Sequence, residues 1–108
     1  MTPSIGELRR RLVIEAASDV ADGGGGYART WSALATVFGR IEPRRRRESV
    51  DDGRVVGLVT HRITIRWRDD VTGDHRFVAD GTVYRVLAVE AHDERRRFLS
   101  CLCEEERQ

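Results

Sequence analysis

The residues of this 108-residue chain that could perform chemistry are two cysteines and three histidines. Cys101 and Cys103 are two positions apart in an alternating apolar run, so on a strand both thiols point to one face, a poor geometry for a disulfide between them. A metal site would need His61, His75 or His92 as a further ligand, but none has the spacing of a zinc motif relative to the thiols. The pattern favours buried structural thiols in a reducing environment and predicts no metal.

The motifs of enzymes and phosphate-binding sites are absent from the sequence. It holds no nucleophile elbow and no HExxH pattern, and the four glycines at 23–26 are not followed by a helical pattern or by a lysine that could reach a phosphate. The pairs Asp51-Asp52 and Asp69-Asp70 are adjacent in sequence and expected to be solvated, so they indicate no acid–base pair. We therefore predict that the protein is not an enzyme, has no catalytic residue and uses no cofactor.

Arginine is the remaining distinctive residue type. All 19 basic residues are arginines, and with 18 acidic residues the formal net charge is +1. This balance argues against tight, sequence-independent DNA binding, and the scattered aromatic residues give no platform on which successive bases could stack. The densest arginine run is followed by acids, and this segment is either a solvated charged loop or a surface that pairs with opposite charges of another molecule. The predicted contact residues are Arg44, Arg45, Arg46, Arg47, Glu48, Asp51 and Asp52.

The elements that must position these residues are strands, because apolar and polar residues alternate along most of the chain. Strands are predicted at residues 8–16, 58–68, 75–79, 82–91 and 96–104, with a strand pair or one bent strand at 29–42. Residues 43–57 are predicted to form a long loop containing at most a short helix, because Ser49 could cap a helical turn that Gly53 would end. Asp80-Gly81 is a strong hairpin signal.

These elements add up to a mainly all-β fold, a small antiparallel β-barrel of about six strands, with a sandwich as the other architecture that the pattern permits. The large apolar residues expected to anchor its core are Trp31, Ile63, Ile65, Trp67 and Tyr84. The length predicts one domain over residues 1–108. No apolar run is long enough to span a membrane and no secretory pattern opens the chain, so no membrane contact is expected.

The order of motifs resembles the phage head–tail joining family, the head-closure or stopper proteins of tailed phages, prophages and gene transfer agents. The similarity runs from roughly Ile5 to Glu105. In the first half of the chain it is carried by a basic first strand, an Asp/Gly-rich hairpin that Trp31 follows, the turn Ile41-Glu42-Pro43 and a charged loop with Glu48. In the second half it is carried by residues 60–67 (THRITIRW), by Gly81 with Tyr84, and by an Arg-rich last strand ending in Cys103-Glu104. The four glycines and the dense arginine run depart from the family pattern.

The resemblance implies a structural role in a virion or particle. The protein would be made in the host cytoplasm and assemble with itself as a ring in the neck at the head–tail interface. Its other partners would be a portal-proximal adaptor protein and a tail terminator or tail tube protein, with weak, transient contact to packaged double-stranded DNA. The ring would help to retain the DNA and would provide the surface to which the tail docks.

Two alternatives remain open at the level of sequence. The chain could be another neck component, either the adaptor or the tail terminator. It could also be a small β-barrel module that binds nucleic acid or protein, with its arginine clusters as the footprint. Salt-dependent binding of the monomer to DNA would favour the module, whereas ring assembly with neck proteins would favour the stopper.

Overall fold

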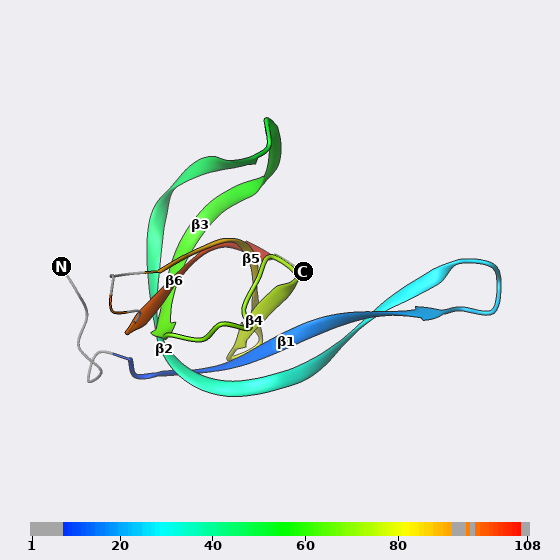
Figure 1. The fold of residues 1–108 in the computed structure, drawn as a ribbon, viewed down its shortest axis with the longest axis horizontal. Coiled ribbons are helices and arrows are strands. Elements are labelled where there is room, and N and C mark those ends of the chain that lie inside the picture. The colour runs from blue at the N-terminus through cyan, green and yellow to red at the C-terminus, as the bar shows by residue number, and fades with distance from the viewer. Residues whose placement is uncertain (1–7, 92–94, 96, 107–108) are drawn as a thin grey trace.

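The structure is a computed structural model, and it describes residues 8–91, 95 and 97–106. They form six strands: β1 (Arg10–Ala21), β2 (Tyr27–Asp51), β3 (Arg54–Arg66), β4 (His75–Ala79), β5 (Thr82–Ala91) and β6 (Phe98–Glu106). No helix occurs in this described part of the chain. Paired strands are antiparallel in the order β1-β2-β3-β6-β5-β4, and pairing of β4 with β1 closes the barrel (Figure 1). The predicted all-β antiparallel barrel of about six strands is confirmed.

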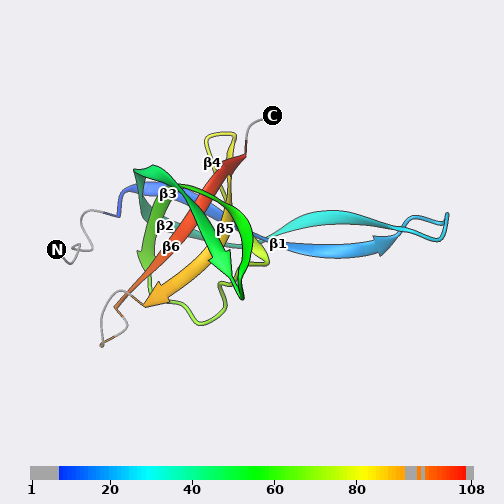
Figure 2. The same cartoon turned by 90° about the horizontal axis from the view of Figure 1, so that it is seen from above.

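The strand β2 is 25 residues long and belongs to two hairpins that extend from the barrel (Figure 1), and the one it forms with β1 is seen at the right of Figure 2. It pairs with β1 as far as Gly39 and with β3 from Gly39 onward, so the segment predicted as a strand pair or bent strand is part of a single strand. A Cβ added to Gly39 would lie 2.5 Å from Leu12 Cδ1 and 2.8 Å from the Thr64 carbonyl oxygen. The absence of a side chain therefore lets β1 and β3 approach β2 at the same point.

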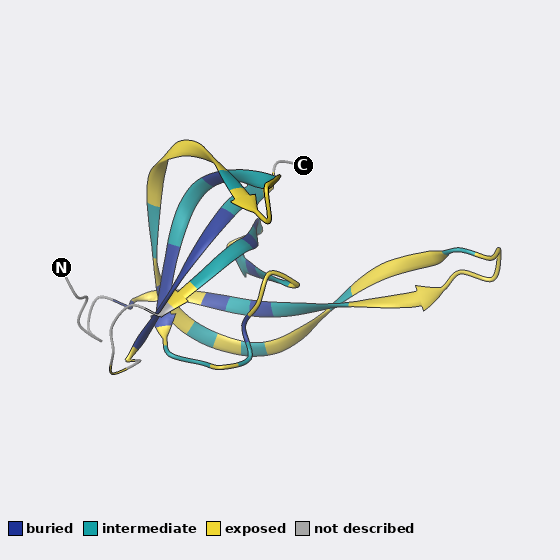
Figure 3. Ribbon diagram, turned by 45° about the horizontal axis from the view of Figure 1, so that its top comes forward, coloured by how far each residue is buried: buried dark blue, intermediate teal, exposed yellow. Residues whose placement is uncertain are grey.

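The core fills the barrel with inward-facing residues from β1 and β3–β6, together with Val71 from the segment between β3 and β4 (Figure 3). Ile63 and Ile65 are fully buried, Tyr84 is buried, and Trp67 is partly buried against the same cluster. The other members are Leu12, Ile14, Val71, Phe77, Ala79, Val86, Leu99, Cys101 and Cys103. The alternation read in residues 58–68 thus places the two isoleucines in the barrel interior.

The expectation that Trp31 anchors the core is wrong. Trp31 pairs with Ala17, one residue beyond Ala16, where the pairing of β1 with β4 ends, so it lies past the barrel wall. Its ring packs instead under the guanidinium of Arg76, whose Cζ is 4.1 Å from the ring centroid. Arg76 Nε in turn donates to Glu15 Oε1 at 2.7 Å, which fixes the cation over the indole.

The prediction of a long loop at 43–57, with at most a short helix, is wrong in its loop. β2 continues to Asp51 and β3 starts at Arg54, so the segment is a β-hairpin turned by Asp52 and Gly53. Both turn residues have positive φ, 52° and 76°, as a two-residue type I′ turn requires. Asp80 and Gly81 also both have positive φ and form the turn between β4 and β5, so the hairpin predicted there is confirmed.

Candidate functional site

The predicted contact residues all lie on this 43–57 hairpin, at the top of Figure 1. Its pairing with β3 is interrupted between Pro43, opposite His61, and Arg47, opposite Val59. Three arginines, Arg44, Arg45 and Arg46, therefore stand against the single residue Thr60, which is a pronounced bulge. The bulge lifts these arginines out of the regular ladder and leaves all three exposed.

The charges of the hairpin are divided along its length. The four arginines occupy the stem and Asp51 and Asp52 the tip, and all six side chains are exposed, as is that of Glu48. None of these seven residues makes an ion pair with another residue in the described ranges. The structure therefore brings the predicted residues onto one hairpin but does not pair its arginines with its own acids. Their charges are available to a second molecule.

The base of the hairpin is attached to the barrel wall by a network around Arg85 and Glu104. Arg85 Nη2 donates to Glu104 Oε1 at 3.0 Å and to the Val56 carbonyl at 3.2 Å, and the Leu58 N–H donates to Glu104 Oε1 at 3.2 Å. A Cβ added to Gly57 would lie 2.8 Å from Glu104 Oε1, so the strand passes close to these side chains. This network fixes the direction in which the hairpin leaves the barrel. It was not predicted from the sequence.

A second hairpin projects from the barrel at the right of Figure 1 and is called here the arm (residues 17–33). Its tip is the glycine run, in which Gly23 and Gly25 have φ values of 83° and 86°. The Asp22 carboxylate accepts the N–H groups of Gly24 at 2.8 Å and Gly26 at 3.2 Å, which closes the turn. The run is therefore a hairpin tip, as the sequence predicts.

The two thiols, His61 and His75 have structural environments. Cys101 and Cys103 are free and buried in the core; burial raises the pKa of Cys101 to about 12 and that of Cys103 well above its usual value. Both are therefore protonated at neutral pH, the form that binds metals poorly. His61 Nδ1 lies 2.9 Å from Thr60 Oγ1, and its ring meets Tyr84 edge-on at 5.1 Å.

Metal and membrane sites are not visible within the described ranges. No group of three His, Cys, Asp or Glu side chains there could hold a metal ion, and no helix in those ranges could cross a membrane. His75 Nδ1 accepts the Thr72 N–H at 3.0 Å in the turn before β4. His92, which the sequence offered as a further ligand, lies outside the described residues.

With the barrel and its two hairpins in place, comparison with known proteins identifies the family. The family model described as "Phage head completion protein" matches residues 3–106. The chain belongs to this family. The resemblance to head–tail joining proteins is thereby confirmed, and a head completion protein is a structural component of the virion.

Two solved structures are similar to this head completion protein. A chain from the "Virion of native gene transfer agent (GTA) particle" is 29% identical with a TM-score of 0.69, over 92% of this chain and 96% of that chain. Protein SF1141 from Shigella flexneri 2a, known as a solution structure, is 25% identical with a TM-score of 0.69, over 95% of this chain and 96% of that one. No curated protein matches the chain.

Proposed function

We propose that the protein is the head-closure, or stopper, component of the neck, forming a ring between a portal-proximal adaptor and the tail terminator or tail tube. The observation that carries the proposal is the family match over residues 3–106, joined to the likeness to a chain of a gene transfer agent virion. In this role the ring helps to retain packaged DNA and offers the surface to which a tail docks. Its work is assembly and closure, without a chemical reaction.

The surface of the molecule supports a role in assembly. The chain exposes 7309 Å², whereas roughly 6,100 Å² is expected for a folded monomer of its mass. A standard interface buries roughly 800 Å² of each partner, so the excess of roughly 1,200 Å² is of the size that assembly would cover.

The 43–57 hairpin is the proposed contact element for a neighbouring copy, a neck partner or the channel. Its stem arginines form no ion pair within the described residues and can meet Glu48, Asp51 or Asp52 of an adjacent copy, because guanidinium groups bind carboxylates in a bidentate manner. Contact with DNA would be weak and transient, since the acids at the tip and the net charge of +1 limit the attraction to phosphates. Retention would therefore be mechanical, by a closed ring, so that DNA can still leave during ejection.

Particle assembly with altered hairpins tests this proposal. Replacing all four stem arginines with serine should leave the barrel folded, because these side chains touch no described residue through an ion pair, but should reduce docking to portal–adaptor complexes. The matched variant with four lysines keeps the charge and loses the guanidinium fork. Deleting residues 48–54 should give tailless heads that package DNA and then leak it. Heads that keep their genomes as well as wild type would refute the closing role of the hairpin.

Imaging of purified particles separates the stopper from the other neck positions. A ring of this chain between the adaptor and the tail is the expected result. Density for the chain directly against the portal would make it an adaptor, and density at the tail's upper end would make it a tail terminator. Salt-dependent binding of the isolated monomer to DNA, without incorporation into particles, would instead support a nucleic-acid-binding module.

A further inference from the structure

The arm is a two-stranded ribbon whose outer edges have no partner strand. β1 pairs with β4 only over Val13–Ala16, and β2 pairs with β3 only from Gly39 onward. Between these limits and the tip, β1 and β2 pair only with each other, and both views show the ribbon extending away from the barrel (Figures 1 and 2). A two-stranded hairpin gains little stability by itself in water. An arm of this length is therefore expected to gain contacts from another molecule.

The end of the arm combines exposed apolar side chains with one unpaired acid. Tyr27 is 76% exposed and Val20 is 51% exposed, both next to the glycine turn. Asp19 and Arg29 neutralise each other through an ion pair of 3.3 Å. Asp22 makes no ion pair with a residue in the described ranges, so its charge is the net charge of the tip. Exposed tyrosine rings are common anchors of interfaces, and a charge nearby can orient the partner that docks.

A complementary hollow lies at the other end of the molecule. It has a volume of about 410 Å³ and is lined by Leu8, Val37, Phe38, Arg66, Trp67 and Arg68. Phe38 in its wall is 58% exposed. Arg68 is held by a bidentate pair with Asp70, at 2.9 and 2.8 Å, which lowers the pKa of the Asp70 carboxyl, whereas Arg66 makes no ion pair within the described ranges.

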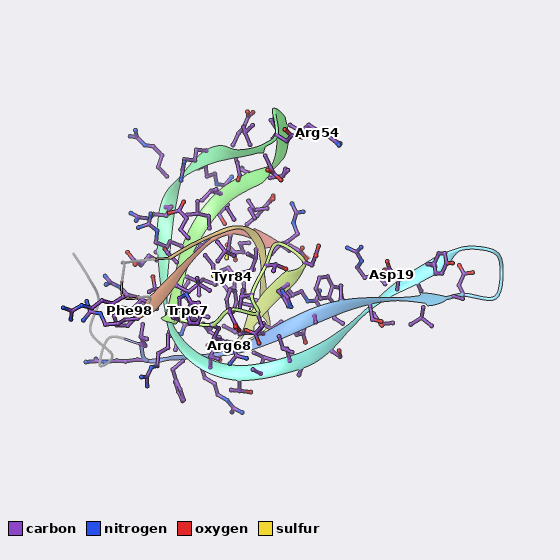
Figure 4. The ribbon with its side chains drawn as sticks, in the orientation of Figure 1. Asp19, Arg54, Trp67, Arg68, Tyr84 and Phe98 are labelled. Carbon is purple, nitrogen blue, oxygen red and sulfur yellow. The ribbon has the colours of Figure 1, made fainter. Side chains whose placement is uncertain are left out.

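The arm tip cannot serve the hollow of its own chain. Figure 4 shows Asp19 on the arm and Trp67 at the hollow toward opposite ends of the molecule, whose longest extent is 50 Å. The two surfaces match in chemistry, since the tip brings an aromatic ring and an unpaired acid, and the hollow brings apolar walls and an unpaired arginine. Two different, complementary patches on one chain make a head-to-tail contact, which generates a ring when the rotation closes.

We propose that the arm tip of one copy docks in this hollow of the next copy, with Tyr27 against Phe38 and Trp67 and with Asp22 facing Arg66. The inference rests on the proposed ring and names the surfaces that join its subunits. The aromatic contact supplies most of the affinity, because buried aromatic residues are the usual anchors of interfaces. The single charge pair sets the orientation and speeds association. This contact does not use the 43–57 hairpin, which stays available to a neighbouring copy, a neck partner or the channel.

A photo-crosslinking amino acid at position 27 of the full chain tests this contact, in the purified protein at high concentration and in assembled particles. The expected product is a dimer whose cross-link maps to a peptide of the second copy containing Phe38 or Trp67. The same probe at Val55, an exposed residue at the tip of the other hairpin, is the matched control and should not label that peptide. Tyr27→Ala should keep the melting temperature, because the ring is exposed, and weaken self-association about 10–100-fold.

Each other outcome has a distinct meaning. Cross-links from position 27 to a different virion protein, or to none while the chain is present in particles, overturn the arm contact and leave the neck role intact. Unchanged self-association of both Tyr27→Ala and Arg66→Glu also overturns it. If the wild-type chain is absent from particles, the proposed function fails and the inference that rests on it fails too.

Discussion

Removal of the Glu104 carboxylate should release the 43–57 hairpin from the barrel. Glu104 Oε1 accepts two hydrogen bonds, one from the Leu58 N–H at 3.2 Å and one from Arg85 Nη2 at 3.0 Å. The side chains are partly solvated, with 31% of Glu104 and 42% of Arg85 exposed, so the charge-assisted bond is weakened by screening. One backbone hydrogen bond and one discounted ion pair together contribute about 1 kcal/mol to the free energy of unfolding. Glu104→Ala should therefore lower the melting temperature by about 4–8 °C.

The decisive measurement is local, because thermal melting alone does not show where stability is lost. Amide hydrogen exchange of residues 54–60 should become about fivefold faster in Glu104→Ala, the factor that corresponds to about 1 kcal/mol. Glu104→Gln keeps an oxygen acceptor for Leu58 and loses the ion pair, so it should give an intermediate effect. Glu106→Ala is the matched control, since Glu106 lies 3.9 Å from Arg85 Nε and contributes little. Equal exchange in Glu104→Ala and wild type would refute the attachment of the hairpin through this residue.

Three further predictions concern the barrel itself. Gly39→Ala should destabilise it by about 1–3 kcal/mol through overlap with Leu12 and the Thr64 carbonyl, whereas Gly24→Ala, whose Cβ meets only Asp22 Oδ1 at 3.6 Å, should be nearly neutral in thermal melts. Cys101 and Cys103 should resist thiol reagents until denaturant is added. Burial raises the pKa of Cys101 from 9.0 to about 12 on folding. The free energy of unfolding should therefore be constant below about pH 9 and fall toward pH 12, by at most about 1.4 kcal/mol per pH unit for this thiol. Denaturant titrations at several pH values measure this fall. A chelator should leave the melting temperature unchanged; a fall of several degrees would indicate a structural metal.

The strands were predictable where apolar and polar residues alternate along the chain. Ile63 and Ile65 alternate with polar residues in β3, so periodicity alone assigns both the element and its inner face. The Asp80-Gly81 turn could also be predicted, because apolar and polar residues alternate on both sides of it. These signals are local, and local signals were enough for the fold class.

The 43–57 hairpin was not predictable in the same way, although Asp52-Gly53 is the same turn signal as Asp80-Gly81. The upstream flank is mostly arginines and acids, and Val50, Val55 and Val56 beside the turn do not alternate regularly with polar residues, since neither face of the hairpin is fully buried. What makes it extended is pairing of β2 with β3 and the attachment by Arg85 and Glu104, residues that are distant in sequence. Trp31 was misplaced for a related reason: periodicity shows which residues share a face but not where the barrel wall ends.

The net charge of +1 conceals a separation of charges that bears directly on assembly. Stem arginines, tip acids, Asp22 and Arg66 are all without an ion pair in the described part of the chain, and they lie at different places on the surface. At physiological salt exposed charges interact only within about 8 Å, so each group acts on whatever docks directly against it. A chain built in this way has little long-range attraction for DNA but can discriminate between protein surfaces at contact. That combination suits the proposed neck ring, which would have to bind its neighbours in one orientation while the DNA beside it remains free to move.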